Sequence, residues 1–469
     1  MMKFSIFGII FVNRKLKIAT ITPRTRPILR LRTSILQTIT VCAALCVGTI
    51  AVQGDEIRTV RTRYIVAETG ECYTMPERPV LFARESSDGR IEPLTAEGDV
   101  NGHVLEVSFD EMSQDFRQYT YTVRHCDASG KPDNLASVEY IEGFTTQDIT
   151  DYTPSLNTRQ VYTHYRFLFP NDDMNLKLSG RYEISIYEDG NPERVVARVP
   201  LLVAEARVRI EGKVLSTTDI ELSGRYQQLE IEVTTDGSNT NLRDDYFIVV
   251  QQNGRHDNQV VAPAPTFVDG KSLRWQHSRP LIFEGGDEYR HFDAYSTYYA
   301  GTGIDRIVYE MGDYHALLNT DELRAGRPYS HEFDVNGQYR VHAERVQDEE
   351  TEAEYMWVHW RLKADQPFFD GAVYVGGDLF GNTFSLRNRM DYDRDMKCYY
   401  LTAPVKQGGY DYQYWFVPKS AISSQQPAAS LLRTEGSHWE TRNEYTVYVY
   451  YKPFGARYER LVGVRTIDK

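Results

Sequence analysis

The tripeptide His125-Cys126-Asp127 combines an imidazole, a thiol and a carboxylate, the groups that bind metals and build nucleophilic sites. The flanking residues alternate as in a β-strand, so the His125 and Cys126 side chains would point to opposite faces. His125 and Asp127 could meet on one face, where such a lone pair is more often a structural hydrogen bond. A Cys–His nucleophile also needs a third, orienting group, and the sequence identifies none. We therefore predict neither a metal nor a nucleophile here.

Asp391, Asp393 and Asp395 alternate like the start of a calcium-binding loop. Such a loop needs glycine at its sixth position and an acidic residue at its twelfth, where this chain has Met396 and Thr402. A hairpin tip with solvated carboxylates is the simpler interpretation. No hydrolase, metalloprotease, phosphate-loop or dinucleotide-binding motif is found, although carboxylates are plentiful enough that a glycosidase pair is not excluded. We predict a protein that is not an enzyme and has no cofactor.

The first 54 residues differ in composition from the rest of the chain. They contain eight Lys or Arg and no Asp or Glu, followed by an apolar run from Ile35 to Val52. This order is typical of a secretory signal peptide, and we assign residues 1–54 to one. A single membrane anchor is the alternative, because the run is about long enough to span a bilayer. A lipoprotein signal is a third reading, but neither Cys42 nor Cys46 has Leu three residues before it.

Removal of the signal would change the formal net charge from −13 to −21, because only positive charges leave. A chain this acidic is not suited to nucleic acid phosphates, so we predict no nucleic acid partner. Cys72, Cys126 and Cys398 would remain, too few for a disulfide scaffold. Export into a bacterial envelope fits both observations.

Alternation with a period of two recurs along the chain. It is clear from Val161 to Phe169 and from Tyr182 to Tyr187, and a Tyr/Val run extends from Tyr445 to Tyr451. Asn253-Gly254 follows another apolar run and is a strong turn signal. Helical periodicity over 12 residues is absent after the signal. The sequence therefore predicts a mainly β protein built from antiparallel sandwiches.

We predict three consecutive immunoglobulin-like or β-sandwich modules. The first covers residues 55–205 and the second residues 206–346. Residues 347–354 (QDEETEAE) are strongly acidic and are predicted to be a solvated linker or hairpin tip. The third module covers residues 355–469.

The third module resembles the immunoglobulin-like modules that bind glycogen and starch. The resemblance rests on the VYVGGD run at residues 373–378 and the KQGGYDYQYWF run at residues 406–416. Those modules follow Gly-Asp with Phe-Asn-x-Trp, whereas this chain has LFGN at residues 379–382 and lacks the tryptophan. Trp415 and Trp439 remain candidates for stacking on a sugar, although core burial is the commoner fate of such residues. A periplasmic carbohydrate-binding protein is thus the alternative function.

Ten short sequence motifs, which we call words, identify a closer resemblance when they are taken in order. They are HCDA (125–128), EYIEGF (139–144), DYTPSLNT (151–158), YTHY (162–165), FPN (169–171), SGRY (179–182), QQNGR (251–255), GGDEYRHFD (285–293), DVNG (334–337) and KQGGYDY (406–412). No single word is specific, but together they make the chain resemble the plug proteins of the type IX secretion system of Bacteroidota. Two departures are mild: DEYR (287–290) replaces the usual Asn-Glu-Phe-Arg, and Ser129-Gly130 replaces an aromatic residue after HCDA.

The resemblance implies a non-enzymatic periplasmic protein at the inner face of the outer membrane. It would cap the periplasmic opening of a large outer-membrane β-barrel translocon, prevent leakage when no cargo is bound, and reach the membrane only through that partner. The resemblance leaves open which surface contacts the barrel. It marks as structural or interface groups His125, Cys126, Asp127, Asn157, Tyr162, His164, Tyr165, Asn171, Asn253, Arg290, Asp293, Asn336, Gln407 and Tyr410.

Overall fold

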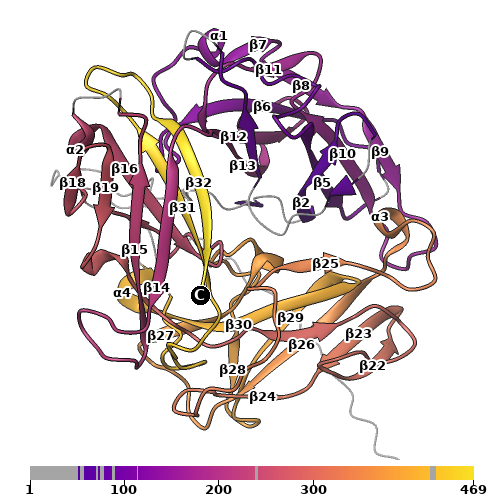
Figure 1. Ribbon diagram of the computed structural model, residues 1–469. Coiled ribbons are helices and arrows are strands. Elements are labelled where there is room, and N and C mark those ends of the chain that lie inside the picture. The colour runs from indigo at the N-terminus through magenta and orange to yellow at the C-terminus, as the bar shows by residue number, and fades with distance from the viewer. Residues whose placement is uncertain are drawn as a thin grey trace, which may run out of the picture. The chain divides into compact units, whose positions relative to one another are not determined.

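The computed structural model describes residues 51–52, 57–69, 72–73, 79–86, 90–113, 115–237, 241–262, 264–422 and 429–469. The predicted signal peptide lies outside these residues, except for Ala51–Val52, which form strand β1. The described chain is mainly β, as predicted (Figure 1). Its helices are short: α1 (Ser137–Tyr140), α2 (Leu242–Asp245), α3 (Glu349–Glu352), α4 (Lys419–Ile422), and the 3-10 turns η1 (Arg279–Leu281) and η2 (Asp378–Phe380).

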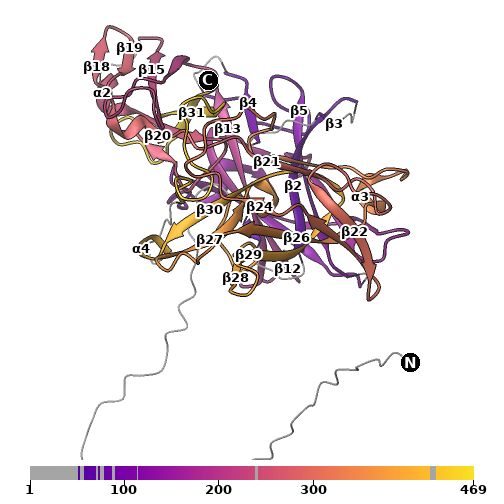
Figure 2. The ribbon, with the colours of Figure 1, turned by 90° about the horizontal axis from the view of Figure 1, so that it is seen from below.

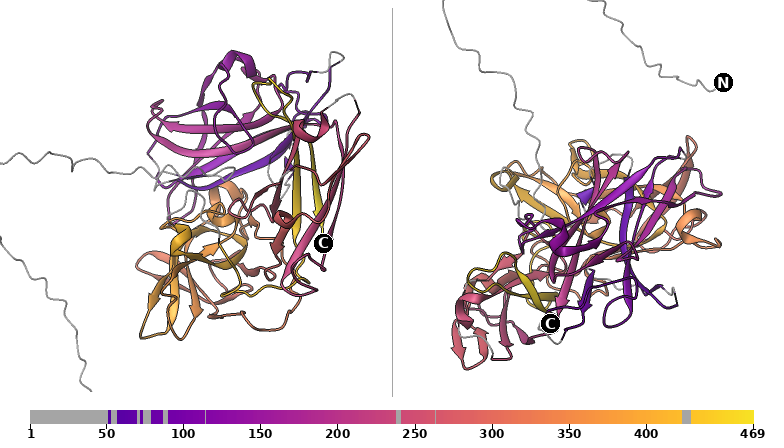
Figure 3. Two further views of the ribbon diagram at one scale, coloured as in Figure 1. Left: turned by 90° about the vertical axis from the view of Figure 1, so that its left-hand side faces the viewer. Right: turned by 90° about the horizontal axis from the view of Figure 1, so that it is seen from above.

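One long sheet forms the backbone of the fold. Its strands run in the order β17-β16-β31-β32-β13-β12-β6-β8, with β1 and β4 paired beside β13. It therefore contains strands from the beginning, the middle and the end of the chain, which Figure 3 shows side by side. The strands are β4 (Val80–Ala83), β6 (Tyr119–Cys126), β8 (Thr146–Ile149), β12 (Gly180–Glu188), β13 (Val195–Glu205), β16 (Tyr246–Gln252), β17 (Val260–Val261), β31 (Glu444–Tyr451) and β32 (Arg460–Asp468).

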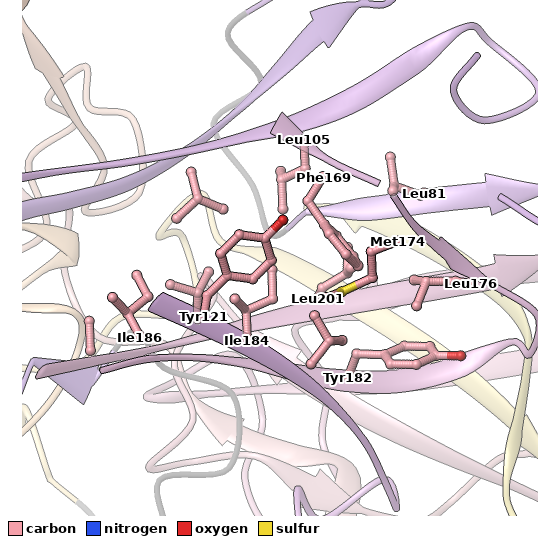
Figure 4. Packing of buried hydrophobic residues seen from close by; sticks show 14 of the residues in the cluster. Leu81, Leu105, Tyr121, Phe169, Met174, Leu176, Tyr182, Ile184, Ile186 and Leu201 are labelled. Atoms are coloured by element: carbon pink, nitrogen blue, oxygen red, sulfur yellow. The ribbon is translucent and has the colours of Figure 1, made fainter. Parts of the chain in front are cut away.

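The first sandwich packs a second sheet, ordered β3-β2-β5-β10-β9, against β6, β12 and β13 of the long sheet. Phe109 of β5 and Tyr165 of β10 stack in its core with a centroid distance of 5.2 Å. Tyr121, Ile184 and Leu201 enter the same core from the long sheet (Figure 4). The strands are β2 (Ile57–Val66), β3 (Cys72–Tyr73), β5 (His103–Glu111), β9 (Asp151–Pro154) and β10 (Thr163–Phe169), with a small pair, β7 (Ile141–Gly143) and β11 (Met174–Leu176), at one side.

The second sandwich covers the other half of the long sheet. Its core contains Leu229 and Trp275 from the covering sheet and Ile248, Val447 and Val462 from β16, β31 and β32. The extreme C-terminal strands thus complete the core of the middle of the chain. The covering strands are β14 (Arg209–Leu215), β15 (Tyr226–Thr234), β18 (Phe267–Asp269), β19 (Ser272–Trp275) and β20 (Ile282–Glu284).

The third sandwich is built from two further sheets around Trp360, Phe292 and Tyr410. The first sheet has the order β22-β23-β26-β29-β28 with β24 beside β26, and the second joins β21, β25 and β27 to β30. The strands are β21 (Arg290–Asp293), β22 (Ile304–Glu310), β23 (Asp313–Leu318), β24 (Asp321–Glu322), β25 (Tyr339–Val341), β26 (Tyr355–Lys363), β27 (Gly371–Gly376), β28 (Asp391–Asp393), β29 (Cys398–Lys406) and β30 (Gly408–Pro418).

Strand pairing and core packing cross two of the predicted module boundaries. β21 to β25 precede residue 346 but share the third core with β26 to β30, while β31 and β32 follow it in sequence but pack in the second core. The described residues from 51 onward form one compact unit. The module boundaries at 205/206 and 346/355 stay predictions. A local sequence pattern does not report which distant strand completes a core.

The prediction that residues 347–354 are solvated is wrong. This segment forms α3, in which Asp348 caps the helix by accepting a hydrogen bond from the Glu350 amide at 3.0 Å. Thr351 and Glu354 are buried. The Glu350 and Glu354 side chains are largely shielded from water because the first sandwich supplies cations to Glu350 and backbone amides to Glu354, whereas Asp348 stays exposed.

Candidate functional site

The outer face of the β2-β5-β10 sheet carries charged side chains where an isolated sandwich would meet water. Phe109 of β5 points into the core, so strand alternation turns its neighbour Asp110 outward. Asp110 lies opposite His164 of β10 in the strand register, and Arg63 of β2 lies opposite Glu106 of β5. Asp110, His164 and Glu106 are nevertheless buried. Another part of the chain must therefore cover this face.

The cover comes from α3 and from the adjoining ends of β26 and β29. Lys406, the last residue of β29, donates from Nζ to Asp110 Oδ2 at 2.7 Å and to the Glu350 carbonyl at 2.6 Å. The hydroxyl of Tyr355, the first residue of β26, donates to the same Asp110 oxygen at 2.8 Å. The Lys406 and Asp110 side chains are 0% and 1% exposed. This ion pair is thus removed from water and connects the first sandwich to the third.

Glu350 of α3 makes the second set of ionic contacts. Its carboxylate pairs with Arg61 and, at 2.7 Å, with Arg63, both on β2. Arg63 Nε also donates to Glu106 at 2.9 Å. His164 completes the group: its Nδ1 lies 2.7 Å from Asp110 Oδ1 and its Nε2 lies 3.7 Å from Glu350. We call the following residues the charged joint: Arg61, Arg63, Asp110, His164, Glu350 and Lys406.

The charges in the joint hold one another ionised. Burial alone would raise the pKa of Asp110, but Lys406 and His164 outweigh it and hold that pKa well below the usual range. Burial likewise opposes ionisation of Glu350, and Arg61 and Arg63 overcome it, lowering the pKa to about 2. Burial lowers the pKa of Lys406, and the Asp110 carboxylate opposes that shift. The joint is therefore a mutually dependent set, in which losing one charge leaves another buried without a partner.

The lowered pKa of Glu350 predicts a pH dependence of stability. A carboxyl group whose pKa is lower in the folded state contributes stability above its unfolded pKa of 4.5 and loses it as the pH falls toward about 2. We expect the difference in unfolding free energy between wild type and Glu350→Gln to shrink between pH 6 and pH 2.5, by on the order of 3 kcal/mol for a complete loss. Denaturant unfolding at a series of pH values measures it.

The comparison with Glu350→Gln removes other titrations from this measurement. Burial raises the pKa of Asp334 to about 7 and that of Asp287 to about 6, so their protonation favours folding as the pH falls through that range. Both groups are present in both variants and their contributions cancel. Glu352→Gln, on the same helix, is the matched control and should follow wild type. An equal pH profile for Glu350→Gln and Glu352→Gln would contradict the ionic role of Glu350.

Four of the residues marked by the sequence lie in or beside the joint. His164 belongs to it, and the Tyr162 hydroxyl donates to the carbonyls of Glu350 and Ala353 at 3.1 and 2.9 Å while its ring lies 4.3 Å from Lys406 Nζ. The Gln407 side chain accepts from the Glu354 amide at 2.9 Å. The Tyr410 hydroxyl donates to the Lys406 carbonyl at 2.5 Å. The words YTHY and KQGGYDY thus both contribute residues to the charged joint and its surroundings.

The HCDA word supports the first sandwich. His125 is buried with Nδ1 2.5 Å from Asp133 Oδ2 and Nε2 3.1 Å from the Ser179 carbonyl oxygen. Its carboxylate partner is therefore Asp133, whereas Asp127 sits in the following turn and accepts from the Lys131 amide at 3.0 Å. Cys126 is a free, buried cysteine, and burial raises its pKa to about 12. His125 and Asp127 therefore both make hydrogen bonds, and the carboxylate that pairs with His125 is Asp133, not Asp127.

The other marked residues of the first sandwich also serve the backbone. The Tyr165 hydroxyl donates to the Arg117 carbonyl at 3.0 Å. Asn171 donates to the Tyr121 hydroxyl at 2.8 Å. Asn157 is exposed and has a φ of +62°, a conformation that asparagine adopts more readily than most residues. Asn157 is thus placed at the surface, in the loop between β9 and β10.

The remaining marked residues lie near the second and third sandwiches. Arg290 is buried and pairs with Glu435 and Asp321, and Asp293 accepts from His291 Nε2 at 2.8 Å. Asn253 and Asn336 have φ of +48° and +54° and begin Asn-Gly turns. Asn253 also donates to Asn443 at 2.7 Å. The structure does not bring these four residues together with the charged joint.

Sequence reasoning missed Asp110, Glu350 and Lys406, the centre of the joint. Lys406 opens the KQGGYDY word and Asp110 lies outside all ten words, so nothing local marks the two residues as partners. Glu350 lies in a segment whose composition indicated exposure. The sequence offered no direct signal for these three residues. The acidic run can form a capped helix beside an apolar strand, so its composition alone did not require a linker.

The described residues give no support for a metal or for a tryptophan platform. Among them no group of three or more His, Cys, Asp or Glu side chains could hold a metal ion. Asp391–Asp393 form β28, and the turn that follows it is closed by Asp393, as expected for a hairpin. All five tryptophans are described and none is exposed; Trp415 is buried, and Lys469 Nζ lies 4.5 Å from the ring centroid of Trp439.

Comparison with known proteins gives a family for part of the chain and a solved structure of similar fold. Residues 84–205, which end with β13, match the family described as "Type 9 secretion system plug protein 1st domain". A crystal structure at 2.30 Å resolution of a hypothetical protein from Parabacteroides merdae ATCC 43184 is 31% identical, with a TM-score of 0.80, and the match covers 90% of this chain and 99% of that chain. The chain therefore contains a first domain of the type 9 secretion system plug protein family. No curated protein matches the chain.

This plug-family domain associates the chain with type IX secretion in a plug role. The family match covers β5 to β13, which supply Asp110 and His164 to the charged joint, whereas Glu350 and Lys406 lie beyond it. In the described part of the chain, no helix is long and apolar enough to cross a membrane.

Proposed function

We propose that the chain is a non-enzymatic periplasmic cap that closes the periplasmic opening of the outer-membrane type IX translocon when no cargo is bound. The observation that supports it is the match of residues 84–205 to the plug family. In this proposal no bond is made or broken, and the protein works by occupying space. The partner is a large β-barrel, and the protein reaches the membrane only through it.

The charged joint supports a role that depends on shape. A cap must keep its parts in fixed positions against the pore, or solutes will pass around it. The joint connects the first and third sandwiches through ion pairs that are shielded from water and therefore little screened by salt. The long sheet connects the first and second sandwiches by continuous strand pairing. Both connections suit a single rigid body.

Co-purification from native membranes tests the proposal. A tagged copy, expressed at its normal level and extracted in mild detergent, should bring with it a large outer-membrane β-barrel protein, identified by mass spectrometry. A strain that lacks the chain should also admit a large hydrophilic antibiotic more readily than its parent. Recovery of the tagged chain without any barrel, together with unchanged permeability, would contradict the proposal.

A further inference from the structure

Exposed apolar side chains gather where the loop between β9 and β10 meets the hairpin of β22 and β23. Met311 at the hairpin tip is 98% exposed and Leu156 in the loop is 58% exposed. Figures 1 and 2 both show α3, which holds this loop, on the same side as β22. We call the following residues the apolar end patch: Phe116, Tyr152, Leu156, Val161, Tyr309 and Met311.

Direct contacts pair two rings of the patch and tie the loop to the hairpin. The rings of Phe116 and Tyr152 lie 4.8 Å apart. The Arg159 guanidinium, in the loop, lies 6.0 Å from the ring centroid of Tyr309 on the hairpin. Gln160 Nε2 donates to Asp313 Oδ1 at 2.5 Å, which ties the loop to the start of β23. The patch therefore bridges the first and third sandwiches.

The charged joint and its flanking residues hold the patch in place. Glu354, just after α3, accepts hydrogen bonds from the backbone amides of Arg159 and Gln160 at 2.6 and 3.0 Å. The Leu156 amide donates to the Thr351 carbonyl at 2.9 Å. The loop that presents the apolar side chains is thus fixed by backbone bonds, so little conformational entropy would be lost when a partner binds.

The charges around the patch indicate the chemistry of the surface that binds it. Glu310 beside Met311 and Glu352 in α3 make no ion pair with any cation in the described residues, the exposed Asp348 caps α3, and the exposed Arg159 is the cation that lies over the patch. Carboxylates left without cations beside exposed rings and a methionine favour a protein surface whose apolar centre is bordered by Lys or Arg. A large exposed apolar patch of this kind is typical of an interaction site.

We propose that the apolar end patch is the surface by which the protein docks on the rim of the translocon barrel, and that the facing rim is apolar with basic residues around it. This inference rests on the proposed function and adds the contact surface to it. Docking through a patch that spans two sandwiches explains why the loop word DYTPSLNT, which is largely exposed, belongs to the signature alongside core words. A second copy of the chain is the competing occupant.

A triple variant tests the surface in the full-length chain. Tyr309→Ser, Leu156→Ser and Met311→Ser together remove apolar area from both sides of the patch, with no core residue touched. The matched control carries Phe369→Ser, Leu386→Ser and Phe454→Ser, three apolar residues on other loops that are on average more exposed than those of the patch. We expect the patch variant to recover at least tenfold less barrel than wild type, equivalent to about 1.4 kcal/mol of binding free energy, and the control to stay within about twofold.

The possible outcomes separate the surface from the function. If wild type, patch variant and control all recover the barrel equally, the docking surface is overturned and the proposed function stands. If wild type recovers no barrel, the proposed function fails first. If wild type is a dimer by light scattering and the patch variant is a monomer, the patch binds a second copy and the docking proposal is overturned. A thermal unfolding midpoint equal to that of wild type establishes that each variant is folded.

Discussion

Lys406→Met is expected to lower the free energy of unfolding at pH 7 by about 3–5 kcal/mol. The substitution keeps most of the side-chain volume but removes the ammonium group 2.7 Å from Asp110 Oδ2. Asp110 would then be a buried carboxylate with only His164 and Tyr355 to satisfy it. Because the desolvation of an unpaired charge is so unfavourable, the loss should far exceed the value of a surface ion pair. Guanidinium unfolding followed by fluorescence measures it.

Lys213→Met is the matched control, since Lys213 pairs with Glu230 at a similar distance, 2.8 Å, but is 64% exposed. We expect it to cost less than about 1 kcal/mol. A double variant of Lys406→Met with Asp110→Asn should recover part of the loss, because the amide keeps an acceptor for Tyr355 and carries no charge. If Lys406→Met cost no more than Lys213→Met, the pair would not be desolvated as the structure has it.

The consequence for function follows from where the pair lies. Asp110 and Lys406 are 296 residues apart in sequence, and their contact is a fully buried ion pair that connects the first and third sandwiches. A variant that weakens it should therefore loosen the arrangement that the apolar end patch spans. We regard the joint as the reason that the loop of residues 155–161 and the β22–β23 hairpin can act as one surface.

The sequence predicted strands well and their surroundings poorly. Alternation from Val161 to Phe169 correctly predicted the strand β10 and put Tyr165 and Phe169 on one face, which the structure shows to be the core face. The same alternation gave His164 a polar outward position without showing that it would be buried, because the residues that cover it come from α3 and β29. Period-two patterns report a sheet's own two faces, and they carry no information on what later packs against the outer one.

The prediction that the acidic segment is solvated was wrong for a related reason. Residues 347–354 have the composition of a solvated linker, and charge composition is a fair guide when the nearest cations are local. Here Glu350 is neutralised by Arg61 and Arg63, which lie on β2 near the other end of the chain. Likewise β31 and β32 read as strands of a third module, yet they pair with β16 and β13. The ten words nevertheless pointed to the plug family, whose first-domain model matches residues 84–205.

Arg290→Met is expected to be as damaging as the loss of Lys406, at about 3–5 kcal/mol of unfolding free energy. Arg290 is buried on β21, and its guanidinium donates to Glu435 from Nη2 at 2.8 Å and to Asp321 from Nη1 at 2.7 Å. Glu435 is fully buried and also accepts the Tyr414 amide of β30 at 2.8 Å. Removing the cation leaves two carboxylates facing the core of the third sandwich. Denaturant unfolding measures the loss.

Arg290→Lys distinguishes the geometry of the guanidinium from its charge. A lysine ammonium has no planar fork and is not expected to reach Glu435, Asp321 and the Glu322 carbonyl together, so we expect an intermediate loss of about 1–3 kcal/mol. Arg209→Met, on an arginine that is 78% exposed and paired with Glu211, should cost less than about 1 kcal/mol. Full stability of Arg290→Lys would show that charge alone matters. An intermediate value would mean that the fork holds β21 to the segment around Glu435, 145 residues away, which makes this arginine a second long-range connection beside the charged joint.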